Sequence, residues 1–486
     1  MLWSGLIRFR RLRCGGDAKI PMESALSPVE AHKAVERIGH ADLVIGIPSY
    51  NNGRTIAQVV RAAYAGLGKY FPQFTAVVIN SDGGSTDDTR EAALSAQVQD
   101  NRLVLLSTPL ASAHRLSFPY HGVPGKASAF RLVFRMAAKL QAKACAVVDS
   151  DLRSITPEWI DMLLRPILFA GYDFVAPCYQ RHKYDGTITD NIVYPLTRSL
   201  YGARLRQPIG GEFGIAARLI ARYLERDDWE TDAARYGIDI WMTTIAIAEG
   251  FRVCQSFLGA RLHDARDPSS DLSAMLQQVV GSVFMLMEEY QSAWGGRSGS
   301  RPVESFGFRF DVGLDPVAVN TERMAKAFCR GCLELEEVWT LALQPETYAA
   351  VRKLGCSACA GAGAVHFPDA LWTRVVFDFA CAHKKYPLSR GQLLRSLTPL
   401  YLGRVASFVQ ESEDLESSEV EQKIEDLCVS FENLKPRLEA HWNNNGPAPV
   451  HDPEAAENRV RMGAAEREPG GTRNDRYVEN DPRRSA

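Results

Sequence analysis

Two aspartates, one residue apart, follow an apolar run in the middle of the chain. Asp149 and Asp151 come directly after the run at 144–148, which is typical of a buried strand. Because side chains alternate along an extended chain, both carboxylates point to the same side. Two like charges held together need an opposing cation, and hard divalent metal ions prefer oxygen ligands. The pattern indicates metal-assisted chemistry on a diphosphate, with a simple turn or helix cap as the commoner alternative.

Two more polar loops follow apolar runs, at 43–47 and at 74–79. Glycines beside an aspartate, as in the second loop, allow close approach of a base or a ribose. The alternative is a strand-to-helix turn without a ligand. The residues singled out in these loops are Pro48, Ser49, Tyr50, Asn52 and Asp82.

Four other residues could carry chemistry but also have structural explanations. Lys126 follows a glycine at an expected helix start, where backbone N–H groups and an ammonium attract an anion. Two glycines before Glu212 either leave room for a ligand or make a tight bend. Asp239 opens a helix, a position that suits any carboxylate. His263 becomes a metal ligand only if the fold returns it to Asp151, since lone histidines are usually structural.

The elements that must position these residues alternate between strand and helix from residue 41. Such alternation predicts an α/β fold with a mostly parallel sheet covered by helices on both faces. Ligands of these sheets bind beyond the carboxyl ends of the strands, so the polar loops should converge on one crevice. Expected helix caps are Ser85 or Thr86, and Thr156 before Pro157. Strands are expected at 43–47, 74–79, 103–106, 144–148, 174–179 and 252–258, and helices at 55–67, 126–142, 191–204, 238–249 and 272–293.

Composition divides the 486 residues into four parts. Residues 1–40 are an N-terminal extension, and residues 41–295 form the α/β domain. The Gly- and Ser-rich segment at 295–300 reads as a linker to a helical region at 296–442. Amphipathic helices there suit a homodimer interface. The tail at 443–486 is polar and rich in Pro and Gly, which predicts disorder.

Charge and composition exclude several classes of protein. The net charge is −2, and no basic stripe suggests nucleic acid. No apolar stretch has the length of a membrane span or of a secretory signal core. The ten cysteines are scattered, a pattern that favours reduced thiols and a cytoplasmic location.

Two Cys-x-x-Cys pairs, Cys329/Cys332 and Cys356/Cys359, leave a zinc site open as a hypothesis. Buried thiols are the preferred interpretation, since the first pair falls in an expected continuous helix over 324–338 and the two pairs are far apart for a zinc ribbon.

The order of the motifs resembles the GT-A glycosyltransferases that use nucleotide sugars. Pro-Ser-Tyr-Asn, Asp-Gly-Gly-Ser-Thr-Asp-Asp-Thr, Gly-Lys and Asp-Ser-Asp follow one another as in that family. The segments at 156–160, 207–212 and 236–239, with His263, are similar to the retaining branch that glycosylates glycerate. That branch includes mannosylglycerate, glucosylglycerate and glucosyl-3-phosphoglycerate synthases. The resemblance covers residues 42–290 and implies a GT-A fold, here with a helical C-terminal extension.

The resemblance also implies roles for the matching residues. Asp151 and His263 would ligate Mg²⁺ or Mn²⁺. The nucleotide sugar would contact Pro48, Ser49, Tyr50, Asn52, Asp82, Lys126, Asp149 and Ser150. The acceptor would contact Arg181, Thr189, Gly211 and Asp239, and the catalytic residues would be Asp239, Glu212 and Lys126. The family often has Glu where Asn52 stands, so the donor base stays open.

The implied activity is the metal-dependent transfer of a hexose from a nucleotide-diphosphate sugar to D-glycerate. Glucose is the favoured hexose. The product would be glucosylglycerate, a compatible solute. Glucosyl-3-phosphoglycerate synthase and mannosylglycerate synthase are the alternatives, and Ala265, just after His263, favours an unphosphorylated acceptor because its side chain cannot bind phosphate. A non-catalytic nucleotide-sugar-binding protein is the rival of a different class, which the Asp-Ser-Asp motif and His263 argue against.

Overall fold

The computed structural model describes residues 36–96, 103–107, 125–231, 237–262, 273–309, 317–359, 365–385 and 388–444. The described residues up to Asn443 belong to one compact unit.

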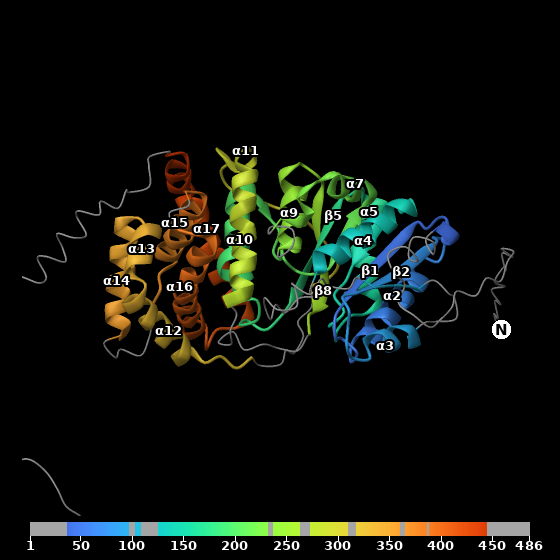
Figure 1. The fold of residues 1–486 in the computed structure, drawn as a ribbon, viewed down its shortest axis with the longest axis horizontal. Coiled ribbons are helices and arrows are strands. Elements are labelled where there is room, and N and C mark those ends of the chain that lie inside the picture. The colour runs from blue at the N-terminus through green and yellow to red at the C-terminus, as the bar shows by residue number, and fades with distance from the viewer. Residues whose placement is uncertain are drawn as a thin grey trace, which may run out of the picture. The chain divides into compact units, whose positions relative to one another are not determined.

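Eight strands of the described residues form one sheet, in the order β10-β8-β5-β7-β4-β1-β2-β3. Figure 1 labels β1, β2, β5 and β8 of this sheet, with helices beside them. All neighbours pair in parallel except β7, which runs antiparallel to both β4 and β5. The predicted mostly parallel sheet is therefore confirmed. The strands are β1 (Leu43–Ser49), β2 (Ala76–Asp82), β3 (Leu103–Ser107), β4 (Ala144–Val147), β5 (Phe174–Gln180), β7 (Phe213–Ala216), β8 (Val253–Ala260) and β10 (Glu304–Phe306), and a separate pair joins β6 (Ala203–Arg204) to β9 (Arg301–Pro302).

Helices cover both faces of the sheet, which explains why its central strands are continuous apolar runs. On β1, Leu43, Ile45 and Ile47 pack against α2 (Ile56–Tyr70) and α5 (Pro157–Ala170). Val44 faces the opposite core, which includes α4 (Lys126–Lys139), α9 (Ile238–Ala248) and α10 (Ser273–Glu289). A Cβ on Gly46 would lie 2.6 Å from Val133 of α4, so this glycine lets the helix approach the strand.

The C-terminal helices share the second of these cores rather than forming one of their own. Buried residues from Val44 to Trp442 belong to the same apolar cluster. Lys435 is buried and donates to the carbonyls of Leu200 (3.3 Å) and Trp294 (2.7 Å), and also to that of Arg297. The helices of this region are α12 (Thr321–Glu334), α13 (Glu336–Ala342), α14 (Pro345–Cys359), α15 (Asp369–Lys385), α16 (Arg390–Glu411) and α17 (Ser417–Asn443).

Shorter elements complete the described fold. They are α3 (Thr89–Ser95), the π-helix η2 (Thr189–Val193), α6 (Tyr194–Tyr201), α7 (Ala217–Glu225), the 3₁₀-helix η3 (Asp228–Glu230) and α11 (Gln291–Trp294). None of the helices in the described part of the chain is long and apolar enough to cross a bilayer.

Two local predictions were wrong for identifiable reasons. The cap of α3 is Asp88, not Ser85 or Thr86. The Ser85 hydroxyl is instead bonded to Asp82 at 2.5 Å. The expected helix over 324–338 is interrupted at Leu335, which separates α12 from α13.

The four paired cysteines lie on α12 and α14. They are free thiols, and Cys356 and Cys359 are exposed, which corrects the expectation that all four are buried. No group of three or more His, Cys, Asp or Glu residues in the described ranges is arranged to hold a metal ion, so the zinc hypothesis gains no support.

Candidate active site

Lys126 lies between two carboxylates at the carboxyl edge of the sheet. Its Nζ is 2.9 Å from Oδ1 of Asp149, which follows β4, and 3.2 Å from Oδ1 of Asp239 in the first turn of α9. Gly125 turns the chain into α4 with a left-handed backbone (φ 74°), which directs Lys126 to this position. Three segments far apart in the sequence therefore meet in one arrangement of charges.

Arg261 provides a second cation just after β8. Its Nη2 is 2.9 Å from Oδ2 of Asp149 and 3.4 Å from Oε1 of Glu212, and its Nη1 donates to the Gly210 carbonyl at 2.7 Å. The five residues Lys126, Asp149, Glu212, Asp239 and Arg261 are called the charge cluster below. With every member ionised, its three carboxylates exceed its two cations by one charge.

Glu212 is the most deeply buried member of the charge cluster, with no exposed surface. The Tyr179 hydroxyl contacts its Oε2 at 2.5 Å and also contacts the Gly210 carbonyl. Burial raises the pKa of Glu212 to about 7, against the opposing influence of Arg261 and with a further rise from Asp149. Burial also raises the pKa of Asp239, although Lys126 opposes this shift. A carboxyl group that exchanges its proton near neutral pH, as Glu212 does, is typical of functional sites.

Gly211 allows the chain to pass against Asp149. Its φ is +95°, and a Cβ there would lie 2.3 Å from Oδ2 of Asp149. The sequence suggested either room for a ligand or a tight bend, and the structure shows that Asp149 occupies the space beside this glycine.

The loops after β1, β2 and β4 are joined by hydrogen bonds. Asn52 Oδ1 accepts from the Tyr50 N–H (2.9 Å) and from the Ser150 hydroxyl (2.8 Å). Ser49 and Asp82 are register partners at the ends of β1 and β2, and both are buried. Pro48 pairs with Ser81 in the same ladder. The predicted donor-binding residues therefore do lie along one edge, as the topology requires.

The carboxylate of Asp82 already accepts hydrogen bonds from its own loop and from the first turn of α3. Arg90 Nε donates to its Oδ2 at 2.7 Å, and the N–H groups of Gly84 and Ser85 donate to the same oxygen at 3.1 Å. These contacts fix the shape of the loop.

Of the two predicted metal ligands, Asp151 and His263, only Asp151 is among the described residues. His263 lies outside the described residues. Its neighbour Leu262 accepts from the Arg153 N–H at 3.0 Å and donates its own N–H to Ser154 Oγ at 2.9 Å. The chain that leads to His263 thus runs along the loop that carries Asp151, and the metal pair stays a prediction.

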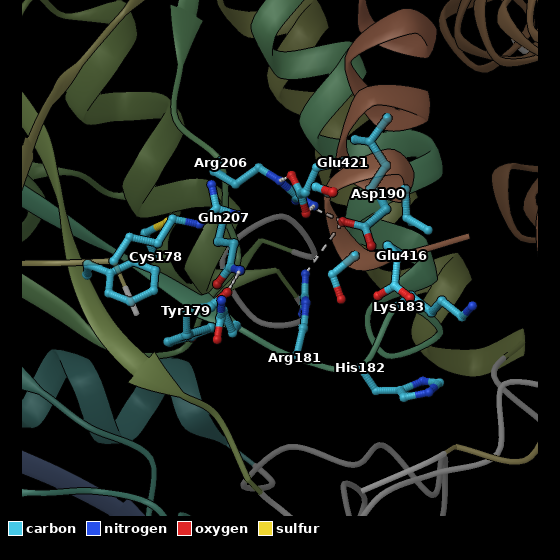
Figure 2. A pocket seen from close by; sticks show the side chains of 17 residues that line it. Cys178, Tyr179, Arg181, His182, Lys183, Asp190, Arg206, Gln207, Glu416 and Glu421 are labelled. Carbon is cyan, nitrogen blue, oxygen red and sulfur yellow. Dashed lines mark hydrogen bonds and ion pairs between the residues drawn. The ribbon is translucent and has the colours of Figure 1, made fainter. Parts of the chain in front are cut away.

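The predicted acceptor residues divide into two places. Gly211 and Asp239 lie at the charge cluster, whereas Arg181 follows β5 and lines a cavity of about 720 Å³ (Figure 2). Thr189 is buried at the start of η2, next to Asp190, whose Oδ1 is 3.7 Å from Arg181 Nη2. Tyr179 connects the two places, since it lines the cavity and contacts Glu212.

Residues 44–214 match the model of Glycosyl transferase family 2. The match spans 171 of the 486 residues, and this part of the chain is similar to glycosyltransferase family 2 domains. The match covers β1 to the start of β7 and includes Lys126, Asp149 and Glu212 of the charge cluster. Together with the mostly parallel sheet it confirms the predicted GT-A-like fold, which is followed by a helical C-terminal region.

No curated protein matches the chain. Among solved structures, it is similar to glucosyl-3-phosphoglycerate synthase from Mycobacterium tuberculosis in complex with Mn²⁺, UDP and glucosyl-3-phosphoglycerate (23% identity, 54% of this chain, 85% of that chain, TM-score 0.38). A structure of the same synthase with Mg²⁺ and UDP gives 22% identity over 54% of this chain and 84% of that chain, with a TM-score of 0.37.

Arg261 and Tyr179 are the main site residues for which the sequence suggested no role. Each stands at or just after the end of a strand, Arg261 after β8 and Tyr179 in β5. A cation at the strand end nearest to several carboxylates is the signal that could have identified Arg261.

Proposed function

We propose that this protein is a metal-dependent retaining glycosyltransferase that moves a hexose, glucose above all, from a nucleotide-diphosphate sugar to D-glycerate. The observation that supports this proposal best is the charge cluster at the carboxyl edge of the sheet that contains the family 2 match, where Lys126 lies within 3.2 Å of both Asp149 and Asp239. Such an edge is where parallel α/β sheets bind ligands.

The leaving diphosphate would lie against the cationic members of the site. Lys126 stands at the first turn of α4, where the helix dipole adds to the attraction of its ammonium for an anion. Asp151 and His263 would hold Mg²⁺ or Mn²⁺, which would neutralise further charge on the diphosphate when bound. The nucleotide would lie along the loops that carry Ser49, Asn52 and Asp82.

The transferred sugar would face the carboxylates of the charge cluster. As the bond to the diphosphate breaks, positive charge develops at the anomeric carbon, and the excess negative charge of the cluster would stabilise it. Ionisation of Glu212 creates that excess, so its pKa near 7 links the charge of the site to pH.

The acceptor hydroxyl would attack from the face that the diphosphate leaves, which retains the anomeric configuration, and its proton would pass to the departing phosphate. Asp239 would orient this hydroxyl. Arg181 suits the acceptor carboxylate, because a guanidinium forms paired hydrogen bonds with such groups.

A matrix of donors and acceptors tests the proposal. The full-length protein is incubated with UDP-, GDP- or ADP-linked glucose or mannose, with D-glycerate or 3-phosphoglycerate, and with Mn²⁺ or Mg²⁺, and the product mass is measured. We expect a product of glucose and D-glycerate that disappears with chelator. A larger yield with 3-phosphoglycerate or mannose would favour the related synthases, and absence of transfer despite donor binding would favour a binding protein.

A further inference from the structure

The cavity beside Arg181 is built by two distant parts of the chain. Its walls come from the end of β5, from Arg206 and Gln207, and from the beginning of α17 in the C-terminal region (Figure 2). Tyr179 belongs to its lining and also contacts Glu212 of the charge cluster. The cavity therefore adjoins the place where we propose that transfer occurs.

Ion pairs hold α17 in place as a wall of this cavity. Arg206 donates to both carboxylate oxygens of Glu421, at 3.0 and 2.9 Å, and to Oδ1 of Asp190 at 2.8 Å. Lys183 donates to the carbonyls of Ser412 (2.7 Å) and Leu415 (3.0 Å), in the connection that precedes α17. Arg206 and Lys183 are thus committed to positioning α17.

Other polar groups of the lining keep bonding capacity. Gln207 is 3% exposed, and its Oε1 has no hydrogen-bond partner within the described structure, although its Nε2 donates to the Tyr179 carbonyl at 3.0 Å. Arg181 Nη2 likewise makes no hydrogen bond to any described group and lies 3.7 Å from Asp190. Ser417, at the first turn of α17, adds an exposed hydroxyl to the lining. A buried acceptor, an arginine and a hydroxyl together suit a ligand with hydroxyl groups and an acid group.

The size of the cavity argues against a three-carbon acid as its whole ligand. D-glycerate has ~7 non-hydrogen atoms, and at a generous ~30 Å³ for each, the share of one water molecule, it would need ~210 Å³. The cavity measures about 720 Å³. This volume falls in the range of pockets that bind compounds several times larger than glycerate.

We propose that the same acceptor site, besides taking D-glycerate, prefers an anionic compound of disaccharide size, a glycerate that already carries a sugar. This inference rests on the proposed glycosyl transfer. The acid group binds Arg181, and the sugar hydroxyls reach Gln207 and Ser417. The C-terminal helical region then has a direct part in acceptor selection, because α17 supplies one side of the acceptor site.

The test compares D-glycerate with glucosylglycerate as acceptors, with the same donor, in three full-length proteins. In the wild type we expect kcat/KM to be ~10-fold higher for glucosylglycerate, the gain expected from one or two added hydrogen bonds. Ser417→Trp fills the α17 side of the cavity and should abolish this preference, because it lowers kcat/KM for glucosylglycerate more than for D-glycerate. Gln422→Trp, at an exposed position of the same helix outside the lining, is the matched control and should keep the preference.

Equal or better use of D-glycerate by the wild type would overturn the inference and leave glycosyl transfer intact. If Ser417→Trp lost the same factor in kcat/KM with both acceptors, the inference would also be overturned. No transfer to either acceptor would refute the proposed function. In that event, calorimetric titration with the two compounds measures the same preference without turnover, and equal affinities would refute the larger acceptor as well.

Discussion

Replacement of Glu212 by glutamine should make the protein more stable at alkaline pH. Glutamine keeps the shape of the side chain and stays neutral in its fully buried position. In the wild type, burial raises the pKa of Glu212 from 4.5 to about 7. Between these two values the folded protein holds a proton that the unfolded chain has lost, so the free energy of unfolding falls as the pH rises. Above pH 7 both states are deprotonated, and the fall is complete.

The size of the effect follows from the shift. About 1.4 kcal/mol for each pKa unit gives a total of about 3 kcal/mol for Glu212. The free energy of unfolding of Glu212→Gln, relative to wild type, should therefore rise by about 3 kcal/mol between pH 5 and pH 8. Most of this rise should occur below pH 7.

Urea denaturation of both proteins at half-unit steps from pH 5 to pH 8 measures this difference. Glu249→Gln is the matched control. Burial disfavours ionised Glu249, but bonds from Arg222 and Tyr290 outweigh this and lower its pKa, so it titrates below the range studied. The free energy of unfolding of Glu249→Gln, relative to wild type, should not change with pH in this range. If the difference between Glu212→Gln and wild type were equally independent of pH, the assigned burial and pKa of Glu212 would be refuted.

Three further substitutions test other parts of the structure. Lys126→Met should lower kcat by ~100-fold, the usual cost of removing one charge-stabilising group, and unchanged turnover would exclude Lys126 from the reaction. Gly211→Ala should lose activity because its Cβ would lie 2.3 Å from Asp149, whereas Gly250→Ala, also at positive φ but with open space around it, should keep full activity and cost only the strain of its backbone. Lys435→Met should lower the free energy of unfolding by about 3 kcal/mol, because it leaves buried carbonyls without their donor, and a loss below 1 kcal/mol in urea denaturation would contradict this role.

The sequence was sufficient to predict the sheet and much of the charge cluster. Asp149, Lys126 and Asp239 each stand at the end of a strand or at the start of a helix. In a parallel sheet, chain topology brings such positions to one edge, whatever the details of packing. Their convergence therefore follows from element order alone.

Contacts that depend on tertiary packing could not be predicted in this way. Arg261 meets Asp149 across 112 residues, and Arg206 meets Glu421 across 215. No local periodicity encodes such pairs. The amphipathic pattern of α17 showed that it packs against something, but not that its first turn lines a cavity beside β5.

The predicted cap Thr156 of α5 is confirmed, but the cap of α3 was missed for a related reason. Ser85 and Thr86 are good capping residues by composition, but the Thr86 N–H donates to Asn51 Oδ1 at 2.9 Å and Ser85 contacts Asp82. Hydrogen bonds within the loops after β1 and β2 therefore delay the start of α3 to Thr89.

The anomeric configuration of the product, measured by NMR coupling for wild type and Asp151→Ala with Mn²⁺, tests the central claim most directly. We predict that the wild type converts an α-linked nucleotide-diphosphate glucose into an α-linked glucoside of the acceptor, and that Asp151→Ala, although folded, yields none. A β-linked product, or undiminished transfer by Asp151→Ala in the presence of chelator, would contradict retaining, metal-dependent transfer at this edge of the sheet.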